Sequence, residues 1–326
     1  MVINGWRLIE RIGAGGMGEV WRARHARLGV GALKLLREEL LADREARSRF
    51  RREAMTLQRI QGLCTGRVLD VEVNGPSPYI VTEYVAGPTL RAHIAQVGPI
   101  TDDNVLQAFA LGLAEALVAV HDAGVVHRDL TATNVLMADK GPKVVDFGIA
   151  RYVDASYSTT TVFRIGTPGW MSPEQILGDD VGPSSDMFCW ALLVCYAAGG
   201  RNCFGIGSPE ALLYRIVHAE PSLPALPSSI APLIVRALDK DPPARPTAAQ
   251  ALLSIERSVG ATTGAFLDHV WPRQAFEAAP RSVAVNPAPL RDPRSLKWQT
   301  RRRDRGHADL TVHYPPPRLS RRGFRR

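Results

Sequence analysis

The sequence predicts an α+β fold in which a small strand-rich part precedes a larger helical part. Three strand-like runs fill residues 5–40, and an amphipathic helical pattern follows over residues 43–60. Two further strand-like runs lie between Gly62 and Val85. From Thr101 onward the apolar residues recur at helical spacing, which indicates long helices. Because strands predominate before residue 85 and long helices follow residue 101, we expect the strands and the helices to be largely segregated.

The first strands enclose a glycine cluster. Residues 6–12 lead into it, and residues 19–23 lead out of it with alternating apolar and polar side chains. The cluster at residues 13–18 fits the pattern G-x-G-x-x-G, which in a dinucleotide-binding fold opens a helix and precedes an acidic residue by about twenty positions. Neither feature follows here. A loop between two antiparallel strands would instead present backbone N–H groups to a polyphosphate, and a glycine-rich turn without a ligand is the alternative.

The helical part contains both amphipathic and buried segments. In the first helical pattern, Phe50 and Leu57 share one face. A long helix is expected to begin with Thr101 as N-cap and to run to His121. The best candidate for a membrane span, residues 187–198, has twelve residues, whereas a membrane helix needs roughly 18 apolar residues. We therefore expect a buried core helix there and no transmembrane segment.

Composition places the chain among globular proteins. Of its 326 residues, 45% are hydrophobic and 22% are charged, which excludes a wholly disordered chain. Four cysteines without a C-x-x-C pair argue against a disulfide scaffold or a zinc module. The N-terminus has neither the basic nor the apolar region of a signal peptide. We expect a cytoplasmic protein with reduced thiols.

Positive charge is concentrated in the C-terminal residues. Residues 257–326 contain fifteen Lys/Arg and five Asp/Glu, whereas the whole chain has a net charge of +8. The main body is therefore slightly acidic. A Pro/Arg-rich tail of this kind is expected to be largely disordered. Binding of nucleic acid or of an anionic lipid surface through the tail is the alternative.

A series of short motifs follows the glycine cluster in a fixed order. The set comprises Lys34, Glu53, His127-Arg128-Asp129, Asn134, Asp146-Phe147-Gly148, Gly166-Thr167-Pro168, Ser172-Pro173-Glu174, Asp186 and Arg245. With these motifs the chain resembles the eukaryotic-like serine/threonine protein kinases of bacteria, in particular of actinobacteria. The resemblance covers residues 4–256. It implies a bilobal kinase fold, with an antiparallel-sheet N-lobe at about 4–85 and a mainly helical C-lobe at about 86–256.

The resemblance implies ATP and Mg²⁺ as cofactors, with Mn²⁺ as an alternative metal. Phosphoryl transfer requires mainly positioning and neutralisation of charge. By resemblance, Asp129 accepts the proton of the incoming hydroxyl, and Lys34 contacts the α- and β-phosphates while Glu53 holds it. Asn134 and Asp146 supply the oxygen ligands of the metal, which suit a hard cation.

The resemblance also implies a nucleotide pocket between the lobes. The glycine loop covers the phosphates, Val20 packs on the adenine, Thr82 lines the back of the pocket, and backbone groups of Glu83 and Val85 bind the adenine. The residues expected at the nucleotide are Ile12, Gly13, Ala14, Gly15, Gly16, Met17, Gly18, Val20, Ala32, Lys34, Thr82, Glu83, Val85 and Leu136.

Other residues of the set are expected to act structurally. For His127 we favour a packed residue over an acid or base, and Phe147 is interpreted in the same way. Asp186, at the start of the buried helix, is expected to hold the backbone of the catalytic loop. Glu174 and Arg245 are expected to form a buried ion pair.

The segment at residues 166–168 resembles the substrate-docking segment of serine/threonine kinases rather than that of tyrosine kinases. Protein substrates with Ser/Thr acceptors are therefore expected, together with self-association for autophosphorylation in trans. The expected phosphate acceptors in the activation loop are Thr159, Thr160 and Thr161, and Ser156 and Ser158 are less favoured. A polar loop without phosphorylation is the alternative.

Thr131 departs from the family pattern. It stands where a lysine normally contacts the transferred phosphate in H-R-D-x-K-P-x-N. A charge-assisted hydrogen bond contributes about 1.5–3 kcal/mol, so its loss predicts a rate roughly 10- to 150-fold lower. We expect a slowed kinase, and a nucleotide-binding pseudokinase that acts as a scaffold is the alternative.

Overall fold

The computed structural model describes residues 1–15, 18–146 and 168–272. All of them belong to one unit of the chain, residues 1–283. Some predictions concern residues outside these ranges. They are the predictions for Gly16, Met17, the phenylalanine and glycine after Asp146, the activation-loop hydroxyls and most of the tail.

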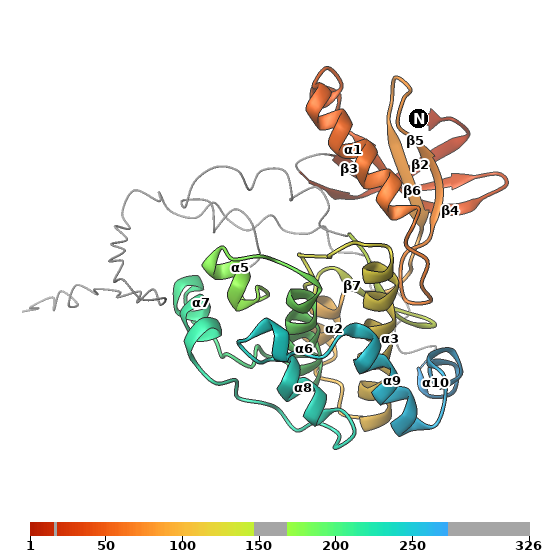
Figure 1. Cartoon of the computed structure of the whole chain (residues 1–326). Coiled ribbons are helices and arrows are strands. Elements are labelled where there is room, and N and C mark those ends of the chain that lie inside the picture. Colours follow the sequence, from red (N-terminus) through yellow and green to blue (C-terminus); the bar gives the residue numbers. More distant parts are fainter. Residues whose placement is uncertain (16–17, 147–167, 273–326) are drawn as a thin grey trace, which may run out of the picture. The chain divides into compact units, whose positions relative to one another are not determined.

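A six-stranded antiparallel sheet forms the N-terminal lobe. Its strands are β1 (Val2–Ile3), β2 (Trp6–Ala14), β3 (Gly18–His25), β4 (Gly29–Leu36), β5 (Val68–Glu72) and β6 (Tyr79–Glu83). Their order in the sheet is β1-β2-β3-β4-β6-β5. A short 3-10 helix (Glu38–Leu40) and helix α1 (Arg44–Leu57) are inserted between β4 and β5, and α1 lies beside the strands (Figure 1). The predicted strand-rich first part is confirmed.

The glycine cluster connects two antiparallel strands, as the sequence predicts. Gly13 of β2 faces Val20 of β3, and Val20 faces Lys34 of β4. Gly18 cannot be replaced by a larger residue without a shift, because an added Cβ would lie 2.4 Å from the carbonyl oxygen of Leu35. The glycine at this position therefore allows β3 and β4 to approach closely.

Helix α1 begins where the sequence favours it. The side chain of Asp43 accepts hydrogen bonds from the backbone N–H groups of Glu45 and Ala46, at 2.8 and 3.2 Å. Such a cap satisfies amide groups that have no partner inside the helix. The buried face of α1 carries Phe50 and Glu53, so a carboxylate is held against the sheet among apolar residues.

Helices dominate the second lobe. The helices are α2 (Leu90–Gln96), α3 (Asp103–Asp122), α5 (Pro173–Leu177), α6 (Pro183–Gly199), α7 (Pro209–His218), α8 (Ala231–Ala237), a 3-10 turn (Pro242–Ala244), α9 (Ala248–Val259) and α10 (Thr263–Val270). A two-stranded hairpin, β7 (Val135–Ala138) and β8 (Gly141–Val144), lies between α3 and α5 in sequence. Figure 1 shows these helices grouped below the strands of the sheet.

Two apolar helices form the centre of this lobe. Helix α6 is buried along most of its length, as predicted for residues 187–198. Helix α3 begins after Asp102, whose side chain accepts from two backbone N–H groups, so the expected N-cap at Thr101 is wrong by one residue. Among the described helices, α3 is also the one long and apolar enough for a membrane span by composition, and 61% of its most apolar stretch is buried inside the fold.

The folded part continues past residue 256, where the tail was expected to begin. Helix α9 ends at Val259, and α10 follows it and packs against α3. Trp271 is only 3% exposed. The first residues of the expected tail, up to Trp271, are therefore packed on the fold through the apolar side chains of Phe266, Leu267 and Trp271.

Candidate active site

The first part of the site joins the sheet to helix α1. Nζ of Lys34, on β4, lies 2.5 Å from Oε1 of Glu53, on α1. Glu53 is 4% exposed, and its Oε2 has no hydrogen-bond partner among the described residues. The ion pair forms only when α1 lies against the sheet, because its two residues belong to different elements. A rotation of the helix away from the sheet would separate the two charges.

The second part is the loop that precedes β7. Nδ2 of Asn134 donates to the backbone carbonyl of Asp129 at 2.8 Å and to its carboxylate at 3.2 Å. The backbone N–H of Val145 donates to the carbonyl of Asn134 at 2.9 Å. This bond holds the next residue, Asp146, beside Asn134. The backbone that carries the two residues expected to bind the metal is therefore joined at the end of β8 and in the loop before β7.

Two residues of the site have a left-handed backbone. Arg128 has φ 63° and Asp146 has φ 56°. Non-glycine residues adopt this conformation at a cost of about 1–3 kcal/mol, which surrounding contacts must offset. For Arg128 the contact is Asp186 at the start of α6, whose carboxylate accepts the backbone N–H groups of His127 and Arg128 at 2.8 and 2.9 Å. The expected role of Asp186 as a support of the loop is confirmed.

Apolar residues from both lobes form a separate small cluster. It contains Val85, Leu136 and Ala138, with Val145 packed against it. In the sheet, Ala32 of β4 faces Thr82 of β6. The residues expected around the adenine therefore lie on adjoining strands and on the hairpin, while Ile12, Ala14 and Gly15 lie on β2 and the glycine turn.

The remaining residues of the loop are buried. His127 is completely buried, and burial lowers the pKa of its imidazole. A neutral, enclosed ring agrees with the packed role that we favoured. Thr131 is 2% exposed, and its hydroxyl lies 2.8 Å from the hydroxyl of Thr133.

The buried ion pair is formed as expected. Both oxygens of Glu174 accept from the guanidinium of Arg245, at 2.7 and 2.9 Å, and Oγ of Ser185 donates to Oε1 at 2.5 Å. Burial by itself would raise the pKa of Glu174, but the hydrogen bonds from Arg245 and Ser185 outweigh burial and hold this pKa below its ordinary value. The pair joins α5 to the residues before α9.

Residues 6–254 match the model of the protein kinase domain. The chain belongs to the protein kinase family. The bilobal fold that the resemblance implied is thereby confirmed.

Three proteins similar to this kinase chain are bacterial serine/threonine kinases. The probable serine/threonine-protein kinase PkwA of Thermomonospora curvata is 39% identical over 253 residues, which cover 78% of the chain and 34% of the relative. The serine/threonine-protein kinase AfsK of Streptomyces coelicolor is 37% identical over 248 residues, with coverages of 76% and 31%. For PkaA of the same organism the identity is 34% over 311 residues, with coverages of 88% and 57%. The chain thus spans between about a third and about six tenths of the length of these curated relatives.

Lys143 contacts one of the expected site residues, and sequence reasoning did not predict this contact. Its Nζ donates to Oε1 of Glu83 at 2.8 Å and to the carbonyl of Thr65 at 3.2 Å. The side chain therefore joins the end of β6 to the loop after α1 and to β8, three residues before Asp146. The one sequence signal for Lys143 was the rarity of its residue type, since only five of the 40 basic residues in the chain are lysines.

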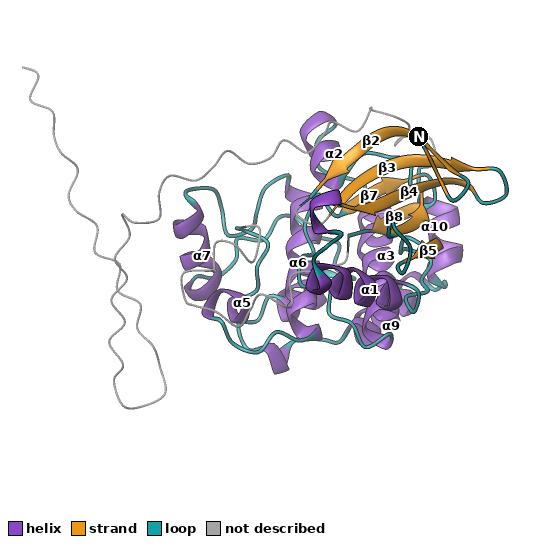
Figure 2. Ribbon diagram, turned by 90° about the horizontal axis from the view of Figure 1, so that it is seen from above, coloured by secondary structure: helices purple, strands orange, loops and turns teal. Residues whose placement is uncertain are grey.

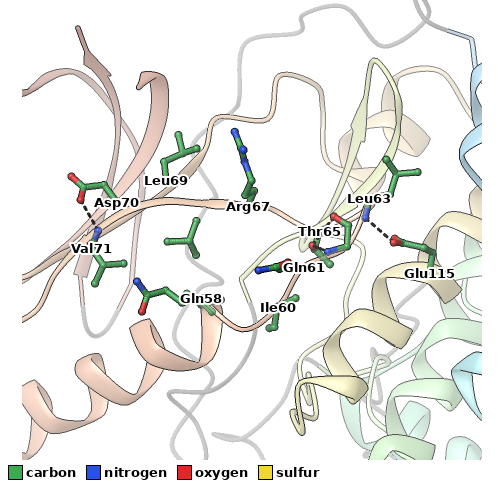
Figure 3. Close-up of a pocket in the computed structure, with 13 residues that line it drawn as sticks. Gln58, Ile60, Gln61, Leu63, Thr65, Arg67, Leu69, Asp70, Val71 and Glu115 are labelled. Carbon is green, nitrogen blue, oxygen red and sulfur yellow. Dashed lines mark hydrogen bonds between the residues drawn. The ribbon is translucent and has the colours of Figure 1, made fainter. Parts of the chain in front are cut away.

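A cavity of about 840 Å³ lies outside the expected site. Its lining comes from the end of α1, the loop that follows, strand β5 and Glu115 of α3 (Figure 3). Glu115 accepts the backbone N–H groups of Leu63 and Cys64 at 2.7 and 2.8 Å and so anchors this loop to α3. None of the residues expected at the nucleotide lines the cavity.

Proposed function

We propose that the chain is an ATP-dependent serine/threonine protein kinase that transfers the γ-phosphoryl group of ATP to protein hydroxyls. The observation that supports this most strongly is the Lys34–Glu53 contact of 2.5 Å, formed with α1 against the sheet. A lysine held by a buried carboxylate cannot move freely, so its charge is kept where the phosphates of the nucleotide would lie. The names of the relatives support Ser/Thr as acceptors.

In this proposal each group has one task. The carboxylate of Asp129 accepts the proton of the acceptor hydroxyl, whose oxygen then attacks the γ-phosphorus while the bond to ADP breaks. Lys34 neutralises charge on the α- and β-phosphates. The cluster of Val85, Leu136 and Ala138 supplies an apolar surface for the adenine.

The donor set fits a magnesium ion. The amide nitrogen of Asn134 donates to Asp129, which leaves Oδ1 of Asn134 as an oxygen ligand, and the carboxylate of Asp146 would supply the second. Among the described residues no cluster of three or more His, Cys, Asp or Glu could hold a metal alone. One or two protein oxygens completed by phosphates are the usual ligands of Mg²⁺. When bound, the ion would neutralise charge on the transferred group, and Mn²⁺ is an alternative.

The proposal includes autophosphorylation in the activation loop, self-association for the reaction in trans, a cytoplasmic location and a rate lowered by Thr131. The acceptor hydroxyls lie outside the described residues. All four of these elements of the proposal are supported by the sequence and by the family resemblance.

The test is incubation of the purified chain with Mg²⁺ and γ-labelled ATP. We expect label on Ser or Thr in the wild type and none in Asp146→Ala, because that variant lacks a metal ligand. Asp180→Ala, which removes an exposed carboxylate, is the matched control and should be labelled like the wild type. Absence of label from the wild type in the presence of ATP would contradict the proposal.

A nucleotide-binding pseudokinase is the second candidate, and one observation favours it. Thr131 is buried and bonded to Thr133, so the catalytic loop presents no cation at this position. Retained ATP binding without phosphoryl transfer, at any concentration of Mg²⁺ or Mn²⁺, would select this candidate.

A further inference from the structure

Helix α10 follows the part of the chain that matches the kinase domain. The match ends at residue 254, whereas α10 spans Thr263–Val270 and is followed by the buried Trp271. Its start is tied to α9: Oε1 of Glu256 accepts from the backbone N–H and the hydroxyl of Thr263, at 2.7 and 2.9 Å. The position of α10 is therefore set by a side chain two residues past the matched segment.

The apolar face of α10 packs on the β7–β8 hairpin as well as on α3. Gly141, the first residue of β8 directly after the turn, has φ 134°, and a Cβ added there would lie 3.1 Å from Cδ1 of Leu267. The side chain of Leu267 therefore lies close to the hairpin where β8 begins. Figure 2 shows α10 beside this hairpin.

Trp271 contacts the strand that carries the apolar floor of the nucleotide site. Its indole Nε1 donates to the carbonyl oxygen of Ala138 at 2.8 Å in a buried environment. The side chain of Ala138 belongs to the cluster with Val85 and Leu136. Leu136 and Ala138 are two positions apart on one strand and therefore share a face. The indole thus holds the strand from its backbone while the side chains of that strand meet residue Val85 of the other lobe.

We propose that Trp271 is a positioning residue for nucleotide binding. It fixes the β7–β8 hairpin so that Leu136 and Ala138 present a preformed surface to the adenine. The proposal rests on the proposed function in that it takes ATP as the ligand of this surface. Phosphoryl transfer itself does not involve Trp271, so the variant should lose affinity for the nucleotide and keep its maximal rate.

The variant that tests this is Trp271→Phe. It keeps an aromatic ring and removes the N–H, which leaves the buried carbonyl of Ala138 without this donor. A hydrogen bond contributes about 0.5–1.5 kcal/mol, so we expect Kd and KM for Mg-ATP to rise about 2- to 10-fold. The kcat and the KM for a peptide substrate should stay unchanged. Leu267→Ala, which loosens the same turn through packing, should shift Kd in the same direction.

Trp190→Phe is the matched control. Nε1 of Trp190 donates to the carbonyl of Ala110 at 3.0 Å, and this bond is also buried, but it joins α6 to α3 and does not contact the hairpin. Both tryptophan variants lose one indole N–H in the interior. A comparable loss of Tm with an unchanged Kd is therefore expected for Trp190→Phe.

Amide hydrogen exchange of residues 135–144 is measured on the same full-length proteins without nucleotide. Faster exchange in Trp271→Phe than in Trp190→Phe, together with a raised Kd, supports the positioning role. Equal Kd values in the two variants, or an unchanged exchange of the hairpin, overturn it. A wild type that binds no nucleotide contradicts the proposed function instead, and the exchange experiment still decides whether Trp271 holds the hairpin.

Discussion

Thr131 shows how the environment of one residue bears on the chemistry of the loop. It lies two residues after Asp129, and its backbone carbonyl accepts the N–H of Asn134 at 3.0 Å. The side chain is turned into the fold, where its hydroxyl meets that of Thr133. The backbone of the loop is therefore well supported although the cation expected at this position is absent.

We predict that Thr131→Lys raises kcat, by about 10- to 150-fold if the restored ammonium contributes a full charge-assisted hydrogen bond in the transition state. Initial rates at saturating ATP and peptide measure this effect. Thr131→Met is the matched control, because it lengthens the side chain without charge and should leave kcat near that of the wild type. A kcat for Thr131→Lys that is unchanged or lower would refute this explanation of the departure.

At the scale of elements, the catalytic loop depends on α6. The first turn of this buried helix presents Asp186 to the loop, where its carboxylate accepts two backbone N–H groups. Nε2 of His121, at the end of α3, lies 2.9 Å from the same carboxylate. Hydrogen bonds to a charged group contribute about 1.5–3 kcal/mol each, which is sufficient to offset the left-handed backbone of Arg128.

We predict that Asp186→Asn lowers kcat roughly 10- to 100-fold, because the amide NH₂ would face a backbone N–H and release the loop. The affinity for ATP should change little, since the Lys34–Glu53 pair and the adenine cluster are untouched. Steady-state kinetics and nucleotide titration separate the two quantities. Asp180→Asn, at an exposed site, serves as control. A kcat equal to that of the wild type would show that the loop does not need this carboxylate.

The stability of the whole molecule depends on ionisable groups that folding removes from water. Glu174 is 4% exposed and Arg245 is 5% exposed. The hydrogen bonds that lower the pKa of Glu174 favour its ionised form in the folded chain. This contribution is fully present above the ordinary glutamate pKa of about 4.3 and is lost as the pH falls through the lower pKa of the folded state.

We predict that Glu174→Gln lowers the free energy of unfolding by about 3–5 kcal/mol at pH 7, because Arg245 keeps its buried charge without a counterion. Below about pH 4.3 the difference between variant and wild type should shrink, since the wild type then loses the same interaction. Urea unfolding at several pH values measures both effects.

The matched control for this pair is Glu45→Gln. It removes the exposed contact of 3.8 Å between Glu45 and Arg49 on α1, and surface pairs contribute about 0–1 kcal/mol. A difference between Glu174→Gln and wild type that stays constant from pH 7 to below pH 4 would contradict the assigned pKa direction. Burial of His127 also destabilises the fold at acid pH, but both proteins contain it, so its effect cancels in the comparison.

Local features of the chain were predictable where a local rule decides them. Asp43 caps α1 because its carboxylate reaches amides two and three residues ahead. The glycine cluster forms a turn between strands because the following residues alternate. Asp102 and Thr101 are both good caps, and which of them begins α3 depends on where the helix packs, so the sequence pattern was wrong by one residue.

The sequence by itself determined the family, a strand-rich first part followed by a helical second part, and the types of side chain that phosphoryl transfer needs, because these follow from short-range periodicity and from motifs read along the chain. It predicted neither α2 nor the β7–β8 hairpin. Only the tertiary structure decided that Lys143 joins Glu83 to Thr65 and that Trp271 reaches Ala138. Trp271 and Ala138 are 133 positions apart, and no local pattern encodes which carbonyl a distant indole will meet. Burial selects that contact, since the packed helices offer the indole at the end of α10 an apolar site and an acceptor.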